Sequence, residues 1–149
     1  MKVVLQRVTH SSVEINGKMN GQIQNGFMAL VGFCSDDNEK IIDKMIDKII
    51  HLRVFEDENG KMNRSLLDVN GSLLSISQFT LYADCRKGRR PGFTHAAKPD
   101  IAIPLYEYFN KAIKEKNIHI ETGIFGADMK VSLLNDGPIT IILDSAEIC

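Results

Sequence analysis

Near the start of the chain, apolar and polar residues alternate as they do in β-strands. The alternation predicts strands at residues 3–8, 13–15 and 19–23, with an Asn-Gly hairpin turn at 16–17. Residues 27–33 are instead almost continuously apolar, which is typical of a central strand covered on both faces. We therefore expect this segment to lie in the middle of a sheet.

Two later segments repeat their apolar residues at helical spacing. The first follows a capping sequence at 36–39 and extends for about 16 residues, with isoleucine and methionine on one face and lysine and aspartate on the other. The second begins near Pro99 and Pro104 and continues to about Lys116. Because proline fits most easily into a first helical turn, Pro104 leaves the exact start of this helix open.

Short apolar runs predict further strands, at residues 53–55, 72–81 and 118–121, and the strand at 72–81 is expected to be central. Residues 83–98 carry many charges together with glycine and proline, so they are expected to form a long surface loop. These elements, mostly antiparallel strands with two amphipathic helices, are compatible with an α/β fold of antiparallel or mixed sheet but do not single it out.

One predicted strand near the end of the chain contains residues that a buried strand rarely tolerates. Between the apolar runs 130–134 and 139–143 stands the tetrapeptide Asn-Asp-Gly-Pro, at 135–138. Proline offers no N–H to a sheet and Asn-Asp favours turns, so the insert is either a tight hairpin or a shaped backbone feature. We favour the second, because a cis Gly-Pro bond would aim two carbonyls where a straight strand cannot, although the sequence alone does not decide the isomer.

Composition fits a single domain over residues 1–149, since 44% of the residues are hydrophobic and the chain is long enough to bury a core. Eighteen basic residues against nineteen acidic ones leave the chain near neutral. This balance argues against a protein that binds duplex nucleic acid mainly through phosphate neutralisation. Three widely spaced cysteines and the lack of any apolar run of about 20 residues predict a cytoplasmic protein with no membrane span.

Familiar catalytic patterns are missing from the sequence. The four histidines and three cysteines show no metal-ligand spacing, so neither a metal nor a cofactor is expected. There is no nucleophile elbow, phosphate-binding glycine loop or dinucleotide fingerprint. What remains is Ser77-Gln78-Phe79-Thr80, where two hydroxyls and an amide lie beside backbone N–H groups. A purely structural role for this segment stays open, because serine and threonine are tolerated in strands.

Two segments carry a resemblance to a known family. Residues 77–81 read SQFTL and residues 135–140 read NDGPIT, and they resemble the two signature motifs of the D-aminoacyl-tRNA deacylases, SQFTL and NxGPxT. The similarity extends over the whole chain and includes the sequence GRRP at 88–91. A sister family that acts on an L-aminoacyl-tRNA looks similar but does not keep phenylalanine in the first motif, so Phe79 favours the D-specific class.

The resemblance implies an aminoacyl-tRNA editing hydrolase that works as a homodimer, with its active site at the subunit interface. It also implies an α/β domain in which two sheets and a helical layer stack. In the family the Gly-Pro bond is cis, and the carbonyls of Gly137 and Pro138 would project into the partner's pocket and exclude L-aminoacyl esters. The catalytic and pocket residues implied are Ser77, Gln78, Phe79, Thr80, Met129, Asn135 and Thr140.

The mechanism that the resemblance implies uses no side-chain nucleophile. An aminoacyl ester is already activated, so positioning, backbone N–H groups at Phe79 and Thr80, and the 2′-hydroxyl of the substrate ribose could suffice. If selectivity arises by rejecting L-esters, the identity of a D side chain should matter little, and glycyl esters should also be substrates. Two alternatives stay open: a generic esterase with Thr80 as nucleophile, which lacks a base nearby in sequence, and a dimer that binds an RNA end without chemistry.

Positive charge is concentrated in the loop at 83–98. A solvated surface turn explains such a run as simply as a binding site does. With the family resemblance in view, we expect the run to grip phosphate near the 3′ end of tRNA, because a near-neutral chain must hold RNA locally. The residues concerned are Arg86, Lys87, Arg89 and Arg90.

Overall fold

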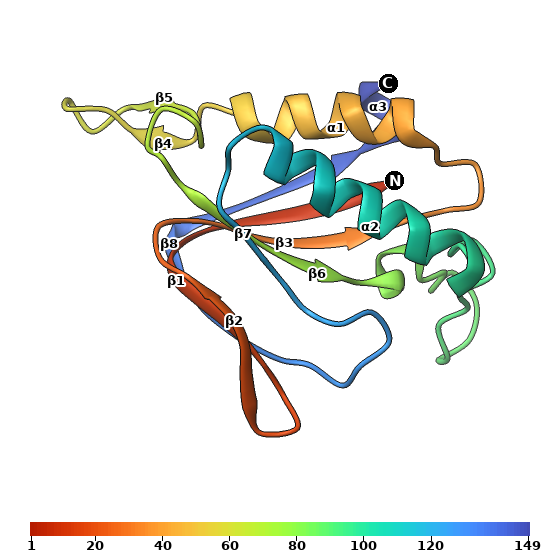
Figure 1. Cartoon of the computed structure of the whole chain (residues 1–149). Coiled ribbons are helices and arrows are strands. Elements are labelled where there is room, and N and C mark those ends of the chain that lie inside the picture. The colour runs from red at the N-terminus through yellow and green to blue at the C-terminus, as the bar shows by residue number, and fades with distance from the viewer.

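A computed structural model describes all residues 1–149 and places helices and sheet in separate layers (Figure 1). The strands are β1 (Lys2–Ile15), β2 (Lys18–Ile23), β3 (Gly26–Gly32), β4 (Phe55–Glu56), β5 (Met62–Arg64), β6 (Ser72–Ser77), β7 (Ile120–Thr122) and β8 (Lys130–Asp144). The helices are α1 (Glu39–His51), the 3-10 helix η1 (Phe79–Tyr82), α2 (Pro99–Glu115) and α3 (Ser145–Ile148). The two long helices, α1 and α2, lie on the same side of the sheet.

Six strands form one mixed sheet. The order is β2-β1-β3-β6-β7, and β8 pairs with β1 alone, so β8 is an edge strand. Strand β1 is antiparallel to β2, β3 and β8, whereas β6 is parallel to both of its neighbours, β3 and β7. The predicted α/β class is confirmed, and the continuously apolar segment at 27–33 forms an interior strand between β1 and β6.

The first two predicted strands are a single strand, β1. Its residues 2–8 pair with β3, its residues 11–15 pair with β2, and β8 runs antiparallel to both halves. Thr9 and His10 are exposed at the point where β1 exchanges one neighbour for the other. The prediction of two strands is wrong because the break in alternation marks a change of neighbour and not the end of a strand.

The sheet bends so that β2 packs over β7, although these strands are not hydrogen-bonded neighbours. The Asn20 side-chain amide donates to the carbonyl of Thr122 at 2.7 Å, and Gly21 lies so close that an added Cβ would stand 3.1 Å from the Cβ of Glu121. A small apolar core fills the bend and consists of Val8, Val13, Ile23, Met28, Leu74 and Ile76. One curled sheet therefore supplies two β layers, and α1 and α2 form the third.

Both long helices form where the periodicity predicts them, with shifted starts. Asn38 caps α1 by accepting a hydrogen bond from the backbone N–H of Ile41 at 3.2 Å, so the helix begins at Glu39. Helix α2 begins at Pro99, and Pro104 lies inside it on the exposed side, where water can reach the carbonyl that loses its partner. Neither helix is long and apolar enough to cross a membrane.

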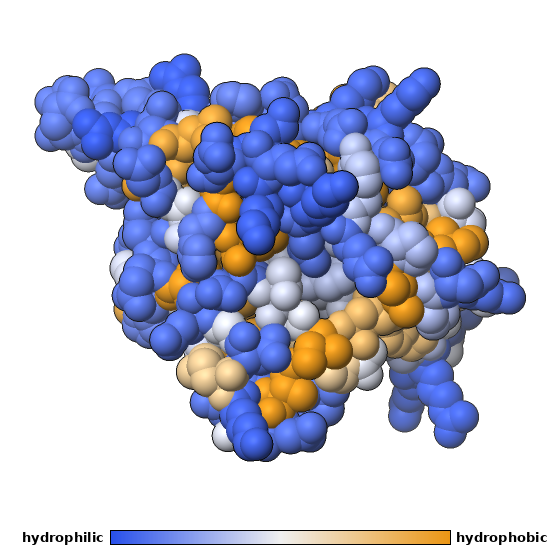
Figure 2. All heavy atoms as spheres, viewed as in Figure 1, coloured by the Kyte–Doolittle hydropathy of each residue, from blue (hydrophilic) through white to orange (hydrophobic).

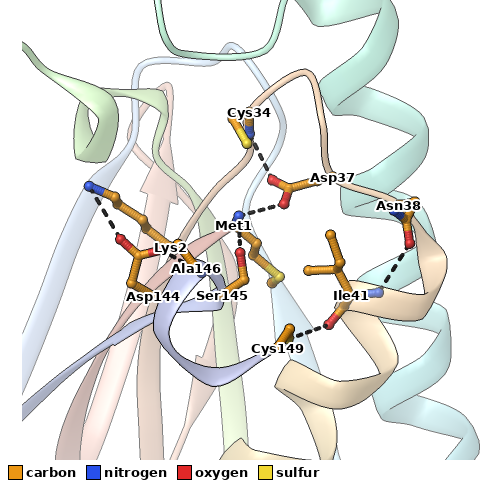
Figure 3. A network of polar contacts seen from close by, with 10 residues as sticks. All are labelled: Met1, Lys2, Cys34, Asp37, Asn38, Ile41, Asp144, Ser145, Ala146 and Cys149. Atoms are coloured by element: carbon orange, nitrogen blue, oxygen red, sulfur yellow. Dashed lines mark hydrogen bonds and ion pairs between the residues drawn. The ribbon is translucent and has the colours of Figure 1, made fainter.

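The start of β1, the turn between β3 and α1, and the end of β8 meet in a polar network (Figure 3). The ammonium group of Met1 is buried and donates to the Asp37 carboxylate and, at 2.7 Å, to the hydroxyl of Ser145. The other oxygen of Asp37 accepts from the backbone N–H of Cys34 at 2.8 Å. Both oxygens of this buried carboxylate therefore accept a hydrogen bond, and the network holds the segment after β3, close to where Val31 pairs with Ser77.

Candidate functional site

The first signature segment leaves the sheet earlier than predicted. Strand β6 ends at Ser77, which is paired with Val31, and the residues after Gln78 form the 3-10 helix η1. The prediction of a strand through residue 81 is wrong, because β3 ends at Gly32 and offers no further pairing partner. Gly32 also permits a close approach, since an added Cβ would lie 2.8 Å from the carbonyl oxygen of Gln78.

The turn into η1 exposes polar groups of the signature segment. The Gln78 side-chain amide donates to the Thr80 hydroxyl at 2.6 Å. The N–H groups of Phe79 and Thr80 stand in the first turn of a helix, where backbone donors have no intrahelical partner. No histidine, lysine or carboxylate side chain hydrogen-bonds to the Thr80 hydroxyl. The segment therefore presents free backbone N–H donors and a Thr80 hydroxyl that is held by Gln78. No general base contacts this hydroxyl.

A cavity of about 280 Å³ lies between this segment and the connection from β7 to β8. Ser77, Gln78 and Phe79 line one side, and Phe125 and Met129 line the other. Figure 2 shows apolar atoms gathered over the β7–β8 connection on a face that is otherwise mainly hydrophilic. The structure thus brings Met129 to the first signature segment and forms a partly apolar pocket with polar groups at one edge.

The second signature segment forms a braced kink in β8. The side chain of Asn135 accepts from the backbone N–H of Ile139 at 2.7 Å and donates to the hydroxyl of Thr140 at 3.1 Å. The Gly137–Pro138 peptide bond is cis, and both residues are exposed. Asn135 and Thr140 therefore shape the kink within their own chain and do not line the 280 Å³ cavity of that chain.

The two signature segments lie at opposite ends of the sheet within one chain. Gly26 of β3 pairs with Val8, and Val8 pairs in turn with Asn135 at the kink. Val31, near the other end of β3, pairs with Ser77. At about 3.3 Å per residue, these two ends of β3 are about 17 Å apart. One chain alone does not bring Gly137 and Pro138 to the Ser77–Thr80 segment.

Arg7 is a site residue that the sequence analysis did not single out. Its side chain is buried, its Nε donates to the carbonyl of Asp136 at 2.8 Å, and an Nη donates to the carbonyl of Val54 at 2.8 Å. The carboxylates of Glu56 and Asp136 lie 3.9 and 3.7 Å away. Arg7 therefore anchors the residue that precedes Gly137. An arginine within the apolar alternation of β1 is the sequence signal that could have revealed it.

The basic loop is tied at its base and open at its tip. Asp84 and Gly92 exchange two backbone hydrogen bonds, at 2.7 and 2.9 Å. Arg86 donates twice to the Asp84 carboxylate, at 2.9 and 2.8 Å, and these bonds lower the pKa of Asp84 to about 2. Lys87 and Arg90 line a cavity of about 470 Å³ beside this pair. The positive charge of Arg86 is thus balanced by the carboxylate of Asp84. In contrast, Lys87, Arg89 and Arg90 are exposed and form no ion pair.

The remaining reactive side chains form no metal centre, although Cys34, Tyr82, Cys85 and His95 line one cavity of about 570 Å³. No three His, Cys, Asp or Glu side chains form a group that could hold a metal ion. Cys34, Cys85 and Cys149 are free thiols. Burial, together with a hydrogen bond to Cys34, raises the pKa of Tyr82 far above its usual range, so this hydroxyl stays protonated at neutral pH.

Comparison with known proteins agrees with the two signature segments. The family model for D-Tyr-tRNA(Tyr) deacylase matches residues 4–144. The chain is 58% identical to a D-aminoacyl-tRNA deacylase of Thermus aquaticus, covering 99% of this chain and 97% of the relative. It is 60% identical to a D-aminoacyl-tRNA deacylase of Bacillus pumilus, covering 99% of this chain and 100% of the relative.

Solved structures agree on the fold. The structure described as c-Myc DNA Unwinding Element Binding Protein superposes with a TM-score of 0.91 at 39% identity, covering 97% of this chain and 98% of the other. A structure described as a probable eukaryotic D-amino acid tRNA deacylase superposes with a TM-score of 0.81, covering 95% of this chain and 97% of the other. At 18% identity, the second likeness concerns the fold alone.

Proposed function

The chain belongs to the D-aminoacyl-tRNA deacylase family and is a hydrolase, and from that premise we propose that it edits mischarged tRNA in the cytoplasm. The reaction is hydrolysis of the ester between a D-amino acid and the terminal ribose, which releases free tRNA and the D-amino acid. The observation that carries the proposal is the family match over residues 4–144, which includes both signature segments. The cavity lined by Ser77, Gln78 and Phe79 supports it.

We propose that the chemistry relies on positioning and backbone donors. An aminoacyl ester needs no strong nucleophile, and the N–H groups of Phe79 and Thr80 are suited to stabilise the oxyanion that forms when water attacks. The substrate's own 2′-hydroxyl helps to activate that water. The absence of any base bonded to Thr80 supports a positioning role for this residue over nucleophilic attack.

The separation of the two signature segments supports a homodimer. In a two-fold dimer, the kink of one subunit can reach the Ser77–Thr80 segment of the other, which lies too far away within its own chain. An apolar stripe crosses the face of the sheet away from the helices, where Ile142 pairs with Val4, Val4 with Leu30, and Leu30 with Ile76. Ile142 is 74% exposed in the single chain. A second copy of the chain would cover this stripe.

Replacing Ile142 by aspartate is expected to convert the dimer into a monomer, because the charge would be buried against the apolar stripe. Sedimentation velocity at matched protein concentrations measures the change. Met62→Asp is the control, since Met62 is 55% exposed on β5, outside the six-stranded sheet. A dimer that survives in Ile142→Asp but dissociates in Met62→Asp would place the interface elsewhere.

Chiral selectivity is proposed to arise by rejection. Rigid carbonyls of Gly137 and Pro138 would occupy the direction that an L side chain takes from Cα, whereas a D side chain would point out of the pocket. The exposure of both residues at the edge strand and the anchoring of Asp136 by Arg7 support this arrangement. Glycine has no side chain, so glycyl-tRNA should also be a substrate.

One assay distinguishes the proposed function from its alternatives. Matched D- and L-aminoacyl-tRNA are incubated with the protein, and ester survival is measured over time. Loss of the D ester alone supports a chiral deacylase. Loss of both esters would indicate a generic esterase, and survival of both would indicate a protein that binds an RNA end without chemistry. Within a D-aminoacyl series, steep dependence on side-chain size would contradict the outward-pointing geometry.

The basic loop is proposed to bind tRNA phosphates. Arg89→Ala combined with Arg90→Ala is expected to raise KM for tRNA and to make the slope of log KM against log salt shallower by about 1 to 2 units, since each lost phosphate contact removes about 0.7–0.9 of a unit. Steady-state kinetics over a salt series checks this. Lys44→Ala combined with Lys48→Ala removes equal charge from the exposed side of α1 and serves as control. An unchanged slope in the loop variant would exclude the loop from binding.

A further inference from the structure

Tyr106 is a buried polar residue that takes no part in the mechanism proposed above. It belongs to α2, which lies over the sheet near β7 (Figure 1), and only 4% of the residue is exposed. Its hydroxyl donates to the backbone carbonyl of Ser75 at 2.7 Å. Ser75 lies two residues before Ser77, where β6 reaches the first signature segment. A side chain of the helix layer therefore holds the backbone that leads into the candidate site.

The carbonyl of Ser75 also marks the place where β7 leaves the sheet. Ser75 pairs with Thr122, the last residue of β7, and its carbonyl accepts a second hydrogen bond from the backbone N–H of Gly123 at 3.1 Å. Gly123 begins the β7–β8 connection, and the sulfur of Met129 lies where a Cβ of residue 123 would stand. One carbonyl oxygen thus holds both α2 and the start of the segment that forms the far wall of the 280 Å³ cavity.

Tyr106 also stands where β7 provides no residue. The N–H of Gln78 points toward β3, because it donates to the carbonyl of Val31 at 2.8 Å. The N–H groups of successive extended residues point to opposite sides, so the N–H of Ser77 points toward β7. Strand β7, however, ends opposite Ser75. The Tyr106 phenol interacts with the backbone of Ser77 and so continues the edge that β7 leaves open.

The ring of Tyr106 reaches the other wall of the cavity. The ring centroids of Tyr106 and Phe125 are 6.2 Å apart, which is within the range of a favourable aromatic pair. Phe125 lines the cavity across from Ser77. Burial raises the pKa of the Tyr106 phenol, so the hydroxyl stays protonated and remains a donor at neutral pH. Tyr106 therefore contacts both walls, with its hydroxyl at β6 and its ring at the β7–β8 connection.

We propose that Tyr106 is a positioning residue for the deacylation reaction, because its hydroxyl and its ring fix the two walls of the cavity relative to each other. This inference rests on the proposed function. Tyr106 does not line the cavity itself. The backbone that it holds leads directly to the N–H groups of Phe79 and Thr80, which are proposed to stabilise the oxyanion. Such donors act in the transition state, so displacing them lowers kcat and leaves KM nearly unchanged.

Tyr106→Phe tests the hydroxyl, because it keeps the ring against Phe125 and removes the donor to Ser75. We expect kcat for D-tyrosyl-tRNA to fall about 10-fold, while KM stays within about 2-fold of the value for the unsubstituted protein. Tyr108→Phe is the matched control and should keep both constants, since Tyr108 lies on the same helix and donates to Asp43 at 2.9 Å, away from the cavity. Both variants are assayed well below their unfolding temperatures, so that loss of folded protein does not contribute.

Two kinetic results would overturn the positioning role. One is an unchanged kcat in Tyr106→Phe, whether or not KM rises, because the hydroxyl would then not act on the transition state. The other is an equal loss of kcat in Tyr106→Phe and Tyr108→Phe, because any lost phenol hydrogen bond on α2 would then have the same effect.

Amide hydrogen exchange tests the geometry without a substrate. The Ser77 amide should exchange about 10-fold faster in Tyr106→Phe than in the unsubstituted protein, and at an unchanged rate in Tyr108→Phe. Equal rates in all three proteins would show that Tyr106 does not hold β6 and would overturn the inference. Failure of the unsubstituted protein to hydrolyse D-tyrosyl-tRNA would overturn the proposed function, and the exchange rates would still decide whether Tyr106 holds the wall of the cavity.

Discussion

Replacing Thr80 by alanine is expected to lower kcat/KM for D-aminoacyl-tRNA about 100-fold, while no acyl-enzyme accumulates in the unsubstituted protein. The reason is geometric. The Thr80 hydroxyl accepts a hydrogen bond from the Gln78 side-chain amide at 2.6 Å. This bond stabilises the turn that orients the N–H groups of Phe79 and Thr80. A displacement of about 1 Å in such a constellation can cost a factor of about 100 in rate.

Rapid-quench kinetics and intact-protein mass spectrometry test both parts of this prediction. Thr80→Ser keeps a hydroxyl for Gln78 and should retain most of the activity, whereas Thr9→Ala removes an exposed threonine hydroxyl from β1 and should have no effect. A burst of product together with an acyl group trapped on Thr80 would show that the hydroxyl attacks the ester. In that case the positioning model would have to be abandoned.

Replacing Arg7 by methionine is expected to weaken the discrimination against L-aminoacyl-tRNA by about 10- to 100-fold. Methionine keeps the side-chain length but removes the donors that hold the carbonyls of Asp136 and Val54. The residue before Gly137 then loses its anchor, and the carbonyls proposed to exclude an L side chain become mobile. Loss of these partners should also lower the free energy of unfolding by about 1–3 kcal/mol.

The ratio of kcat/KM values for matched D and L esters measures this effect. The ratio does not depend on the fraction of folded enzyme, so it separates selectivity from stability. Arg53→Met is the control, because Arg53 is exposed and donates only to Asn63. If Arg7→Met is less stable but keeps the full ratio of kcat/KM for the D ester to kcat/KM for the L ester, the contact of Arg7 with the kink does not contribute to selectivity.

Local patterns in the sequence determined most of the elements. Helical spacing located α1 and α2, the Asn-Gly pair located the turn between β1 and β2, and a continuous apolar run identified β3 as interior. These features follow from burial and from backbone preference, and both are set by residues within a few positions of each other in the sequence. The signature segments were also visible, because each is a short contiguous stretch of sequence.

Tertiary structure alone decided how these pieces meet. Whether β1 is one strand or two, and where β6 ends, depends on partners far away in the sequence: β2 and β3 share β1, and Gly32 ends the pairing of β6. Arg7 acquires its role from Asp136, through a contact between segments that are distant in the sequence. Periodicity records which face of an element is buried but not which residue lies across from it, so the anchoring of the kink by Arg7 emerges only when the chain is folded.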